Sequence, residues 1–368
     1  MCERCSFCIL PTNLPNLTLD HNCKCNYCRE SETSHADKSH LPHDNMEERF
    51  EAVMKKLRGK GKYDCLVPLS GGKDSSYVLY VLVKKYNMKA LAYNFDNGFR
   101  HEQAIRNMEN LVNQLGVDLV IYKPRQDMMH RLFKTFLSKT GEFCTPCNML
   151  INATAYRLAR QNGIKAIMSG TLPQLESGLE GVSPSQYYDR KYYLNVAKAL
   201  ISRSERDYYT VPAYCRTAIR RLTGRGPTVI NVLEYFRPNV TQIHEELQAI
   251  GWESPGGAIE HGDCRLPPIK DYLQYKKWGC SEVTGLFSLL VRNGEITREE
   301  ALRRAIDKEP HEAPPILPEF LKVIGMTKSE FNEALKRDFR EIPNMRSSVF
   351  FRWAKKVVQK IERVRRRR

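Results

Sequence analysis

The stretch Pro68-Leu69-Ser70-Gly71-Gly72-Lys73-Asp74-Ser75-Ser76 follows an apolar run and precedes an amphipathic one. This order predicts a strand, a tight glycine turn and the start of a helix. A glycine pair lets the backbone turn sharply and bring its N–H groups close to a ligand, and a helix start adds a positive dipole end. The stretch therefore predicts an anion site, with phosphate as the expected ligand. The alternative is an ordinary glycine turn before a helix.

This stretch differs from the nucleoside-triphosphatase loop, because Lys73 follows two adjacent glycines and precedes an aspartate. Ser70, Gly71, Gly72, Lys73, Asp74 and Ser75 instead resemble the loop of the ATP pyrophosphatases, the PP-loop family. The resemblance implies that Ser70 to Ser76 bind the pyrophosphate end of ATP, with Lys73 stabilising phosphate charge and Asp74 helping to hold magnesium. It also implies that a substrate oxygen takes AMP, which a nitrogen or sulfur nucleophile then displaces.

Composition indicates a soluble globular protein that binds anions. The chain has 368 residues and a net charge of +16, from 58 Lys+Arg against 42 Asp+Glu. This balance favours a nucleic acid, a nucleotide or a membrane surface as partner without choosing among them. No run approaches the roughly 18 apolar residues of a membrane span, and the N-terminus has cysteines and charges where a signal peptide has an apolar core. We therefore expect a cytoplasmic location.

Cysteine spacing near the N-terminus predicts a zinc ribbon. Cys5-x-x-Cys8 and Cys25-x-x-Cys28 are separated by 16 residues, within the range of four-cysteine zinc sites. A reducing compartment disfavours a disulfide framework, and so short a segment needs a metal to fold. Cys2 and Cys23 are left over and could substitute as ligands. A redox or iron site is the alternative.

Strands alternate with helices after this ribbon, which predicts an α/β fold with a doubly wound parallel sheet. Asp96 and Gly170 follow two of these strands and are expected at the carboxyl edge, where the nucleotide or magnesium would lie. A simple turn aspartate is the alternative for Asp96. The predicted strands are 65–67, 90–95, 119–122 and 166–168, and the predicted helices are 46–61, 101–115, 126–139 and 148–162.

The remaining segments complete the predicted domain organisation. Polar residues 31–45 predict a solvated linker, although their three histidines could form a metal cluster. Tyrosine and arginine between 175 and 240 could stack on nucleic acid or a sugar nucleotide, or form an inserted helical subdomain with snorkelling arginines. The predicted domains are a zinc ribbon (1–30), the linker (31–45), a PP-loop ATP-binding domain (46–174), a basic and aromatic insertion (175–240), a C-terminal helical region that completes the substrate site (241–348) and a basic amphipathic tail helix (349–368).

A second group of cysteines lies in the middle of the chain. Cys144-Thr-Pro-Cys147 immediately precedes a predicted helix, and Cys264 follows more than 100 residues later. Three converging thiolates could hold a 4Fe-4S cluster with one open iron, which resembles the arrangement in some PP-loop tRNA thiolation enzymes. The alternative is a structural turn with buried thiols.

The whole chain also resembles the N-acetyl sugar amidotransferases of bacterial surface-glycan biosynthesis. That family converts a sugar N-acetyl group to an acetamidino group, using ATP and ammonia from a partner glutaminase. Asn148 and the Asp263-Cys264 pair depart from its pattern, and a third cysteine is what a sulfur-inserting relative would need. The resemblance rests on Cys5-x-x-Cys8-Ile-Leu-Pro, Cys25-Asn-Tyr-Cys28, Ser70 to Ser75, Asp96-Asn-Gly-Phe99, Cys144-x-Pro-Cys147, Gly251-Trp252 and Gly294 to Leu302.

Three functions therefore remain open from sequence. The first is an AMP-forming sugar amidotransferase with ATP, magnesium and zinc, acting on a sugar nucleotide or another anionic substrate. The second is an ATP-dependent sulfurtransferase on tRNA or a small molecule, in which Cys144, Cys147 and Cys264 are catalytic. The third is an RNA-binding module with a degenerate ATP site. Capping boxes at Thr297 and Thr327 predict helices in the C-terminal region, and a homo-oligomer is left open.

Overall fold

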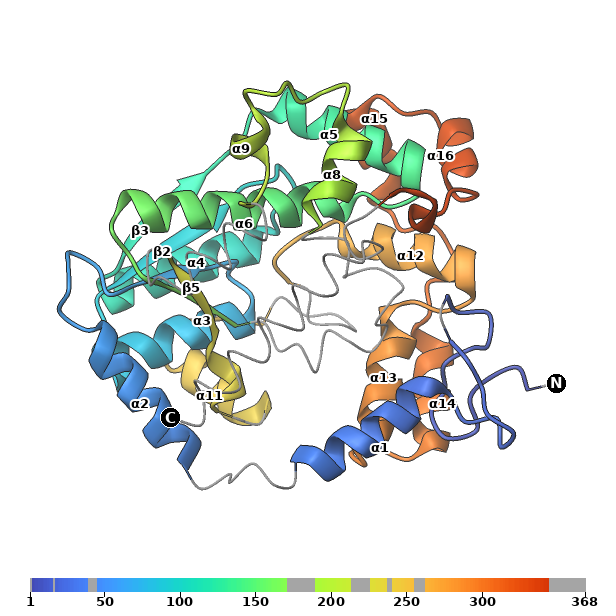
Figure 1. Cartoon of the computed structure of the whole chain (residues 1–368), viewed down its shortest axis with the longest axis horizontal. Helices are drawn as coiled ribbons and strands as arrows, with labels where there is room; N and C mark the ends of the chain where they lie inside the picture. Colours follow the sequence, from blue (N-terminus) through green and yellow to red (C-terminus); the bar gives the residue numbers. More distant parts are fainter. Residues whose placement is uncertain are drawn as a thin grey trace.

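A parallel sheet of five strands, on the left in Figure 1, organises the fold. The computed structural model describes residues 2–15, 17–38, 45–170, 189–212, 226–236, 240–254 and 262–343, with only the backbone at 33–38 and 240. The strand order is β3-β2-β1-β4-β5, and every pairing is parallel. The strands are β1 (Cys65–Pro68), β2 (Ala90–Phe95), β3 (Asp118–Tyr122), β4 (Ala166–Ser169) and β5 (Thr228–Asn231).

Helices cover both faces of this sheet, because strand side chains alternate between two cores. Leu66 and Leu91 pack in one core, while their neighbours Val67 and Ala92 pack in the other. The first core includes α5 (Gln126–Thr140) and α6 (Cys144–Gln161). The second includes α2 (Met46–Leu57), α3 (Lys73–Tyr80), the π-helical turn η2 (Val81–Lys85), α4 (Glu102–Leu115) and α11 (Val240–Gln248). The predicted doubly wound α/β fold is confirmed.

The chain reverses its winding direction at β1. Strands β2 and β3 follow on one side of β1, whereas β4 and β5 lie on its other side. Loops at the carboxyl ends of β1 and β4 therefore meet at the topological switch point, which is where ligands bind in sheets of this kind. The loop at Ser70 and the residue Gly170 follow these two strands.

The segment 175–240 is not wholly an insertion, contrary to our expectation. Its residues 228–231 form β5, which pairs with all of β4, so the chain returns to the sheet. Of its tyrosine pairs, Tyr192 and Tyr193 on α8 (Arg190–Ala197) have no exposed surface and pack in the core. These rings cannot stack on a nucleic acid. Also in this segment are α9 (Arg206–Tyr209) and the 3-10 turn η5 (Val232–Glu234); Tyr187, Tyr188 and the arginines at 216–225 lie outside the described residues.

The C-terminal region is helical, as predicted. Thr327 begins α16 with both hydrogen bonds of a capping box to Glu330, and the Thr297 hydroxyl accepts the Glu300 N–H at the start of α14. The tail helix expected over 349–368 lies outside the described residues. The helices are α12 (Pro267–Trp278), α13 (Glu282–Arg292), α14 (Arg298–Lys308), α15 (Leu317–Ile324), α16 (Lys328–Ala334) and the 3-10 turn η6 (Phe339–Glu341).

The expected linker 31–45 is helical in its first half. Helix α1 (Asn26–Lys38) starts inside the second cysteine pair and continues past residue 31. The prediction that an irregular linker begins at residue 31 is therefore wrong. Residues 39–44, which include two of the three histidines, lie outside the described part. Within the described ranges, no helix has both the length and the apolar content to cross a membrane.

Candidate functional site at the PP-loop edge of the sheet

Gly71 is the tightest point of the glycine loop. Its φ is +86°, and a Cβ atom at this position would lie 2.1 Å from the Ala104 carbonyl oxygen. Both the backbone conformation and the packing against α4 therefore require glycine. Gly72 has a φ of −74° and caps α3, so its role is to let Lys73 begin the helix.

Hydrogen bonds between two serines close the loop. The Ser70 and Ser75 hydroxyls lie 3.0 Å apart, and the Ser70 N–H donates to Ser75 Oγ at 3.1 Å. The Lys73 ammonium lies 3.2 Å from the Asp74 carboxylate. Ser76 differs from the other loop residues, because its side chain is fully buried and its N–H donates to the Gly72 carbonyl. In this arrangement Ser76 offers no polar group to a ligand.

Two residues outside the motif hold the loop from behind. The Trp252 indole N–H donates to the Gly71 carbonyl at 3.0 Å, and the Asn107 amide lies 3.4 Å from the same oxygen. Sequence reasoning missed both residues as part of the site. For Trp252, its position beside Gly251 in a family-like motif was the available signal.

Gly170 and Asp96 lie at the carboxyl edge of the sheet, directly after β4 and β2. A Cβ atom at Gly170 would be 3.0 Å from the Asp74 carbonyl oxygen, so glycine allows the β4 loop to touch the first turn of α3. Asp96 is buried and accepts the Gly98 N–H and the Arg100 guanidinium, at 2.9 and 3.0 Å. The guanidinium of Arg100 therefore neutralises the carboxylate that we expected to face adenosine or magnesium.

The mid-chain cysteine pair lies inside helix α6, not before it. We expected a helix from 148, but α6 begins at Cys144, so Cys144 and Cys147 share one face three residues apart. Pro146 is compatible with a first turn, where its missing N–H costs no hydrogen bond. The Glu142 carboxylate accepts the Thr145 N–H at 3.1 Å and the Tyr192 hydroxyl at 3.2 Å, which anchors this helix start.

Asn97 brings Cys147 and Cys264 together. Its side-chain amide nitrogen lies 3.4 Å from Cys264 Sγ and 3.7 Å from Cys147 Sγ. Its oxygen accepts the Phe99 N–H at 2.8 Å, which orients the NH₂ group toward the two sulfurs. Sequence reasoning singled out Asp96 and missed this neighbouring residue.

A short backbone pairing carries Cys264 to this position. Cys264 forms an antiparallel bridge with Arg100, and the Arg265 N–H donates to the Phe99 carbonyl at 2.8 Å. The same segment reaches the glycine loop, because a Cβ atom on Gly72 would contact the Asp263 Cβ at 3.7 Å. Cys264 and the loop are thus neighbours in space, although more than 180 residues separate them in sequence.

The three cysteines do not form a compact single-ion site. Burial raises the pKa of Cys144 and Cys147, and raises that of Cys264 to about 11. Among the described residues, only another group of cysteines has its ligand atoms all within 4.8 Å of one another. A cluster with several metal atoms would spread its thiolates more widely than one ion does. The donor set is therefore compatible with such a cluster but not, as arranged, with one tetrahedral ion.

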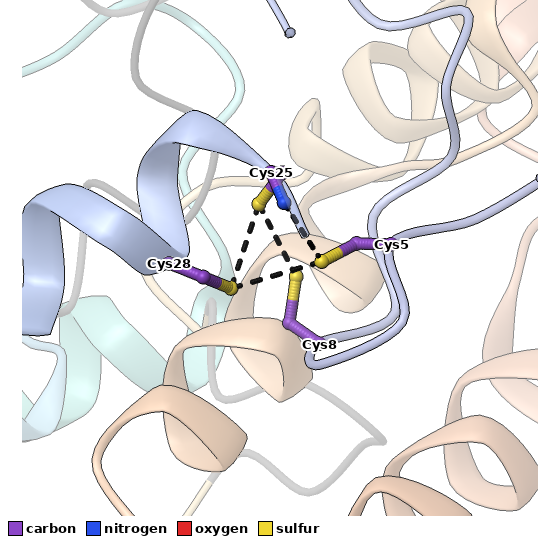
Figure 2. Close-up of side chains that lie close together, drawn as sticks. All are labelled: Cys5, Cys8, Cys25 and Cys28. Carbon is purple, nitrogen blue, oxygen red and sulfur yellow. Dashed lines mark hydrogen bonds between the residues drawn. The ribbon is translucent and has the colours of Figure 1, made fainter. Parts of the chain in front are cut away.

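Cys5, Cys8, Cys25 and Cys28 form that compact group (Figure 2). All are fully buried, and Figure 2 shows their sulfur atoms converging on one point. Hydrogen bonds from Cys25 and then Cys28 lower the pKa of Cys8. Four buried thiols at this spacing fit a structural zinc ion, which would take all four as thiolates.

This cysteine group is attached to the C-terminal helices. The Arg298 guanidinium donates to the Cys8 and Cys5 carbonyls at 3.2 and 3.3 Å. Ile9, just after the first pair, is buried against α13 and α14, and Figure 1 shows the N-terminal segment beside these helices. The ribbon therefore packs as part of the C-terminal region and is not an independent appendage.

Cys2 and Cys23 are not additional ligands. They form a disulfide, whereas we expected reduced thiols that could substitute in the metal site. Cys23 lies in a tight turn with a φ of +59°, next to Lys24, whose N–H bonds the Asp20 carboxylate. The other four thiols of this segment are grouped with one another, and Cys23 pairs with Cys2 instead.

Comparisons with known proteins agree with this geometry. Residues 252–363 match the family model described as LPS biosynthesis protein WbpG-like, C-terminal domain. The tRNA-specific 2-thiouridylase MnmA of Campylobacter lari is 26% identical over 137 residues, which cover 35% of this chain and 40% of MnmA. These matches support the resemblance to PP-loop ATP pyrophosphatases that the loop at Ser70 predicts. An uncharacterized protein of Methanocaldococcus jannaschii is 23% identical over 259 residues, covering 70% of this chain and 78% of the relative.

One solved structure also aligns with this chain. The U34-tRNA thiolase NcsA from Methanococcus maripaludis, determined with its [4Fe-4S] cluster, is 13% identical, with a TM-score of 0.34. The alignment covers 86% of this chain and 93% of NcsA. A TM-score this low does not establish a shared fold.

Proposed function

We propose that this PP-loop protein is an ATP-dependent, AMP-forming amidotransferase that converts the N-acetyl group of a sugar nucleotide to an acetamidino group. One observation supports this most. The WbpG-like segment 252–363 reaches the glycine loop, through Trp252 on the Gly71 carbonyl and Asp263 beside Gly72. A segment typical of lipopolysaccharide biosynthesis thus contributes directly to the proposed ATP site.

The loop residues have the chemistry that this reaction needs. Backbone N–H groups of the loop and the Lys73 ammonium would bind the pyrophosphate, and Asp74 would help to hold magnesium. The acetamido oxygen attacks the α-phosphorus and pyrophosphate leaves. Ammonia then forms a bond to the amide carbon, and the C–O bond breaks with its electrons staying on AMP. The acetamidino product keeps the proton as a cation. The ammonia would come from a partner glutaminase.

Pyrophosphate exchange tests the first half of this reaction. Purified protein is incubated with ATP, magnesium, labelled pyrophosphate and a panel of UDP-linked N-acetylated sugars. We expect acceptor-dependent exchange that is lost in Asp74→Ala, and, on adding an ammonium salt, a product in which NH replaces oxygen. Exchange that no acceptor stimulates, or that survives Asp74→Ala, would contradict the proposal. Asp127→Ala is a matched control, because Asp127 is an exposed aspartate in the first turn of α5.

Sulfur transfer is a second candidate, favoured by one observation. The side-chain amide of Asn97 contacts the sulfur atoms of both Cys147 and Cys264, beside the proposed ATP site. Three thiolates there could hold an iron–sulfur cluster that supplies a site for sulfide. Anaerobic purification with iron, sulfide and zinc analysis distinguishes the two candidates. About four iron atoms per chain, lost in Cys264→Ala, would favour sulfur transfer, whereas zinc alone at about one per chain would contradict it.

The RNA-binding alternative has less support. RNA binding would need exposed aromatic rings for stacking, but Tyr192, Tyr193 and Tyr209 are buried. Tyr208 is 44% exposed and is the tyrosine of this segment that could still meet a base, within the part described. RNA that copurifies with salt-sensitive affinity, without exchange activity, would revive this alternative.

A further inference from the structure

Asp263 is an acidic residue beside the glycine loop that has no role in the mechanism above. The segment that leads into Cys264 brings it there, so that a Cβ atom on Gly72 would lie 3.7 Å from the Asp263 Cβ. The Asp263 carbonyl accepts the His101 N–H at 3.2 Å, which fixes its backbone beside the start of α4. The side chain of Asp263 therefore begins next to the residue that caps α3.

The carboxylate of Asp263 is not neutralised by a neighbouring side chain. Asp263 is half-buried, and within the described ranges its carboxylate has no hydrogen-bond donor and no ion-pair partner. The two other aspartates near the loop differ in this respect. Asp74 lies 3.2 Å from the Lys73 ammonium, and Asp96 accepts the Arg100 guanidinium at 3.0 Å. Of these three acidic groups, Asp263 is the one whose charge is left uncompensated.

An uncompensated carboxylate at a phosphate-binding loop needs a cation when the phosphate binds. Lys73 and Asp74 offset each other's charge, so the attraction of the loop for phosphate depends largely on its backbone N–H groups and on the dipole of α3. Asp263 would repel a triphosphate held there, because both groups are negative and only a few ångströms of partly desolvated space separate them. Magnesium removes this repulsion, since it binds phosphate oxygens and carboxylates together.

The oxygen donors beside the loop fit magnesium. This ion prefers hard oxygen ligands and commonly takes one or two carboxylates together with substrate phosphates and water, so it needs no closed protein cage. Asp74 has a side chain that is 44% exposed, and Asp263 contributes a second carboxylate from another segment. Asp96 fits this role less well, because it is buried and its two oxygens already accept the Gly98 N–H and the Arg100 guanidinium.

We propose that Asp263, and not Asp96, is the second carboxylate that holds magnesium with ATP at the glycine loop. The inference rests on the proposed function in one respect, which is that ATP binds at this loop. It assigns a role to a residue that the WbpG-like segment brings from far along the chain. Cys264 follows directly and lies 3.4 Å from the Asn97 amide, so the same short segment would join the magnesium–ATP site to the cysteine site.

Binding of an ATP analogue with and without magnesium tests this proposal in the absence of turnover. The Kd of α,β-methylene-ATP, which cannot release pyrophosphate, is measured by calorimetry in EDTA and in excess magnesium. In EDTA, Asp263→Asn should bind the analogue about fivefold more tightly than wild type, because a like charge has been removed. In magnesium the order should reverse, so that magnesium improves the Kd of wild type about tenfold more than that of Asp263→Asn. Asp263→Ala should behave in the same way.

Glu253→Gln is the matched control for a general effect of charge near the loop. Glu253 is an exposed acid of the same region, and its backbone N–H and carbonyl bond the Asn107 amide that lies behind Gly71. The effect of magnesium in Glu253→Gln should equal that in wild type.

The outcomes separate this assignment from the proposed function. An equal magnesium effect in wild type and both Asp263 variants, or an equal loss in Glu253→Gln, would overturn the role of Asp263 and leave the proposed function standing. Magnesium-dependent binding that is lost in the Asp263 variants, with no pyrophosphate exchange on any acceptor, would support Asp263 and contradict the proposed function. A wild type that does not bind the analogue would overturn both.

Discussion

The indole N–H of Trp252 donates a 3.0 Å hydrogen bond to the carbonyl oxygen of Gly71, across 181 residues of sequence. Gly71 has a positive φ and packs against α4, so its carbonyl points into a buried space that needs a donor. Trp252 supplies that donor from the start of the WbpG-like segment. The C-terminal region thereby supports the loop that we propose binds ATP.

Replacing this indole should weaken ATP binding. Trp252→Phe keeps the aromatic bulk but removes the N–H, which leaves the Gly71 carbonyl with only the longer contact to the Asn107 amide at 3.4 Å. Losing a hydrogen bond of this kind costs about 0.5–1.5 kcal/mol. We expect the KM for ATP in pyrophosphate exchange to rise severalfold. Trp278→Phe is the control, because Trp278 does not contact the loop, and its KM for ATP should match that of wild type. An unchanged KM in folded Trp252→Phe would show that the bond has no functional role.

The two loop glycines should respond differently to alanine. Gly71→Ala places a methyl group 2.1 Å from a backbone oxygen at a φ of +86°, whereas at Gly72 the nearest contact is 3.4 Å and φ is −74°. We expect Gly71→Ala to lose roughly 2 kcal/mol or more of unfolding free energy in urea, and Gly72→Ala to lose about 1 kcal/mol or less. Equal losses would mean that the packing of Gly71 on α4 is not the constraint.

Removing one ribbon cysteine should remove a metal ion. Cys8→Ser takes one thiolate from the buried group of four, so zinc content should fall from about one per chain to near zero. The N-terminal segment should then become sensitive to protease, because the metal supplies much of its folding energy. Cys280→Ser is the matched control, since Cys280 is a buried cysteine that packs on the same cluster without belonging to the four-sulfur group. Zinc retained in Cys8→Ser would contradict the assignment.

Asp271 should make the fold less stable as pH rises. Burial raises its pKa from 3.8 to about 7, and one carboxylate oxygen has no hydrogen-bond partner among the described residues. Because the folded state holds this proton more tightly than the unfolded chain, its contribution is present below pH 4 and is lost between about pH 4 and pH 7.

An amide at this position should remove that dependence. Asp271→Asn keeps the shape without the ionisable proton, so we expect it to gain roughly 2–4 kcal/mol over wild type at pH 8, and much less at pH 4. Urea unfolding at the two pH values measures the gain. Asp307→Asn changes the same charge on the exposed surface of α14 and should show no such gain. Equal gains at both pH values would exclude titration of Asp271 as the cause.

Sequence reasoning was most successful where a pattern is local. The strand before Ser70 and the helix from Lys73 follow from an apolar run and a glycine pair, and the capping box at Thr327 follows from its spacing to Glu330. The grouping of Cys5, Cys8, Cys25 and Cys28 follows from two short turns joined by few residues. In each case, neighbours in sequence supply most of the determining contacts.

Predictions from sequence were wrong where the local composition does not indicate which side chains are buried. Polar residues after Cys28 predicted a linker, but α1 continues to Lys38. A stacking surface that includes Tyr192 and Tyr193 was one of two alternatives from sequence, yet both rings are in the core. Strand β5 was assigned to an insertion, because four residues carry too weak a pattern to show that they pair with β4.

The sequence by itself determined the loop, the alternation of strands and helices, and the cysteine pairs, because these depend on residues a few positions apart. Only the tertiary structure decided that Asn97 faces both Cys147 and Cys264, and that Trp252 holds Gly71. These contacts join segments 50 to 181 residues apart. They exist because a doubly wound sheet brings the carboxyl ends of its strands to one edge, whatever their order in the chain.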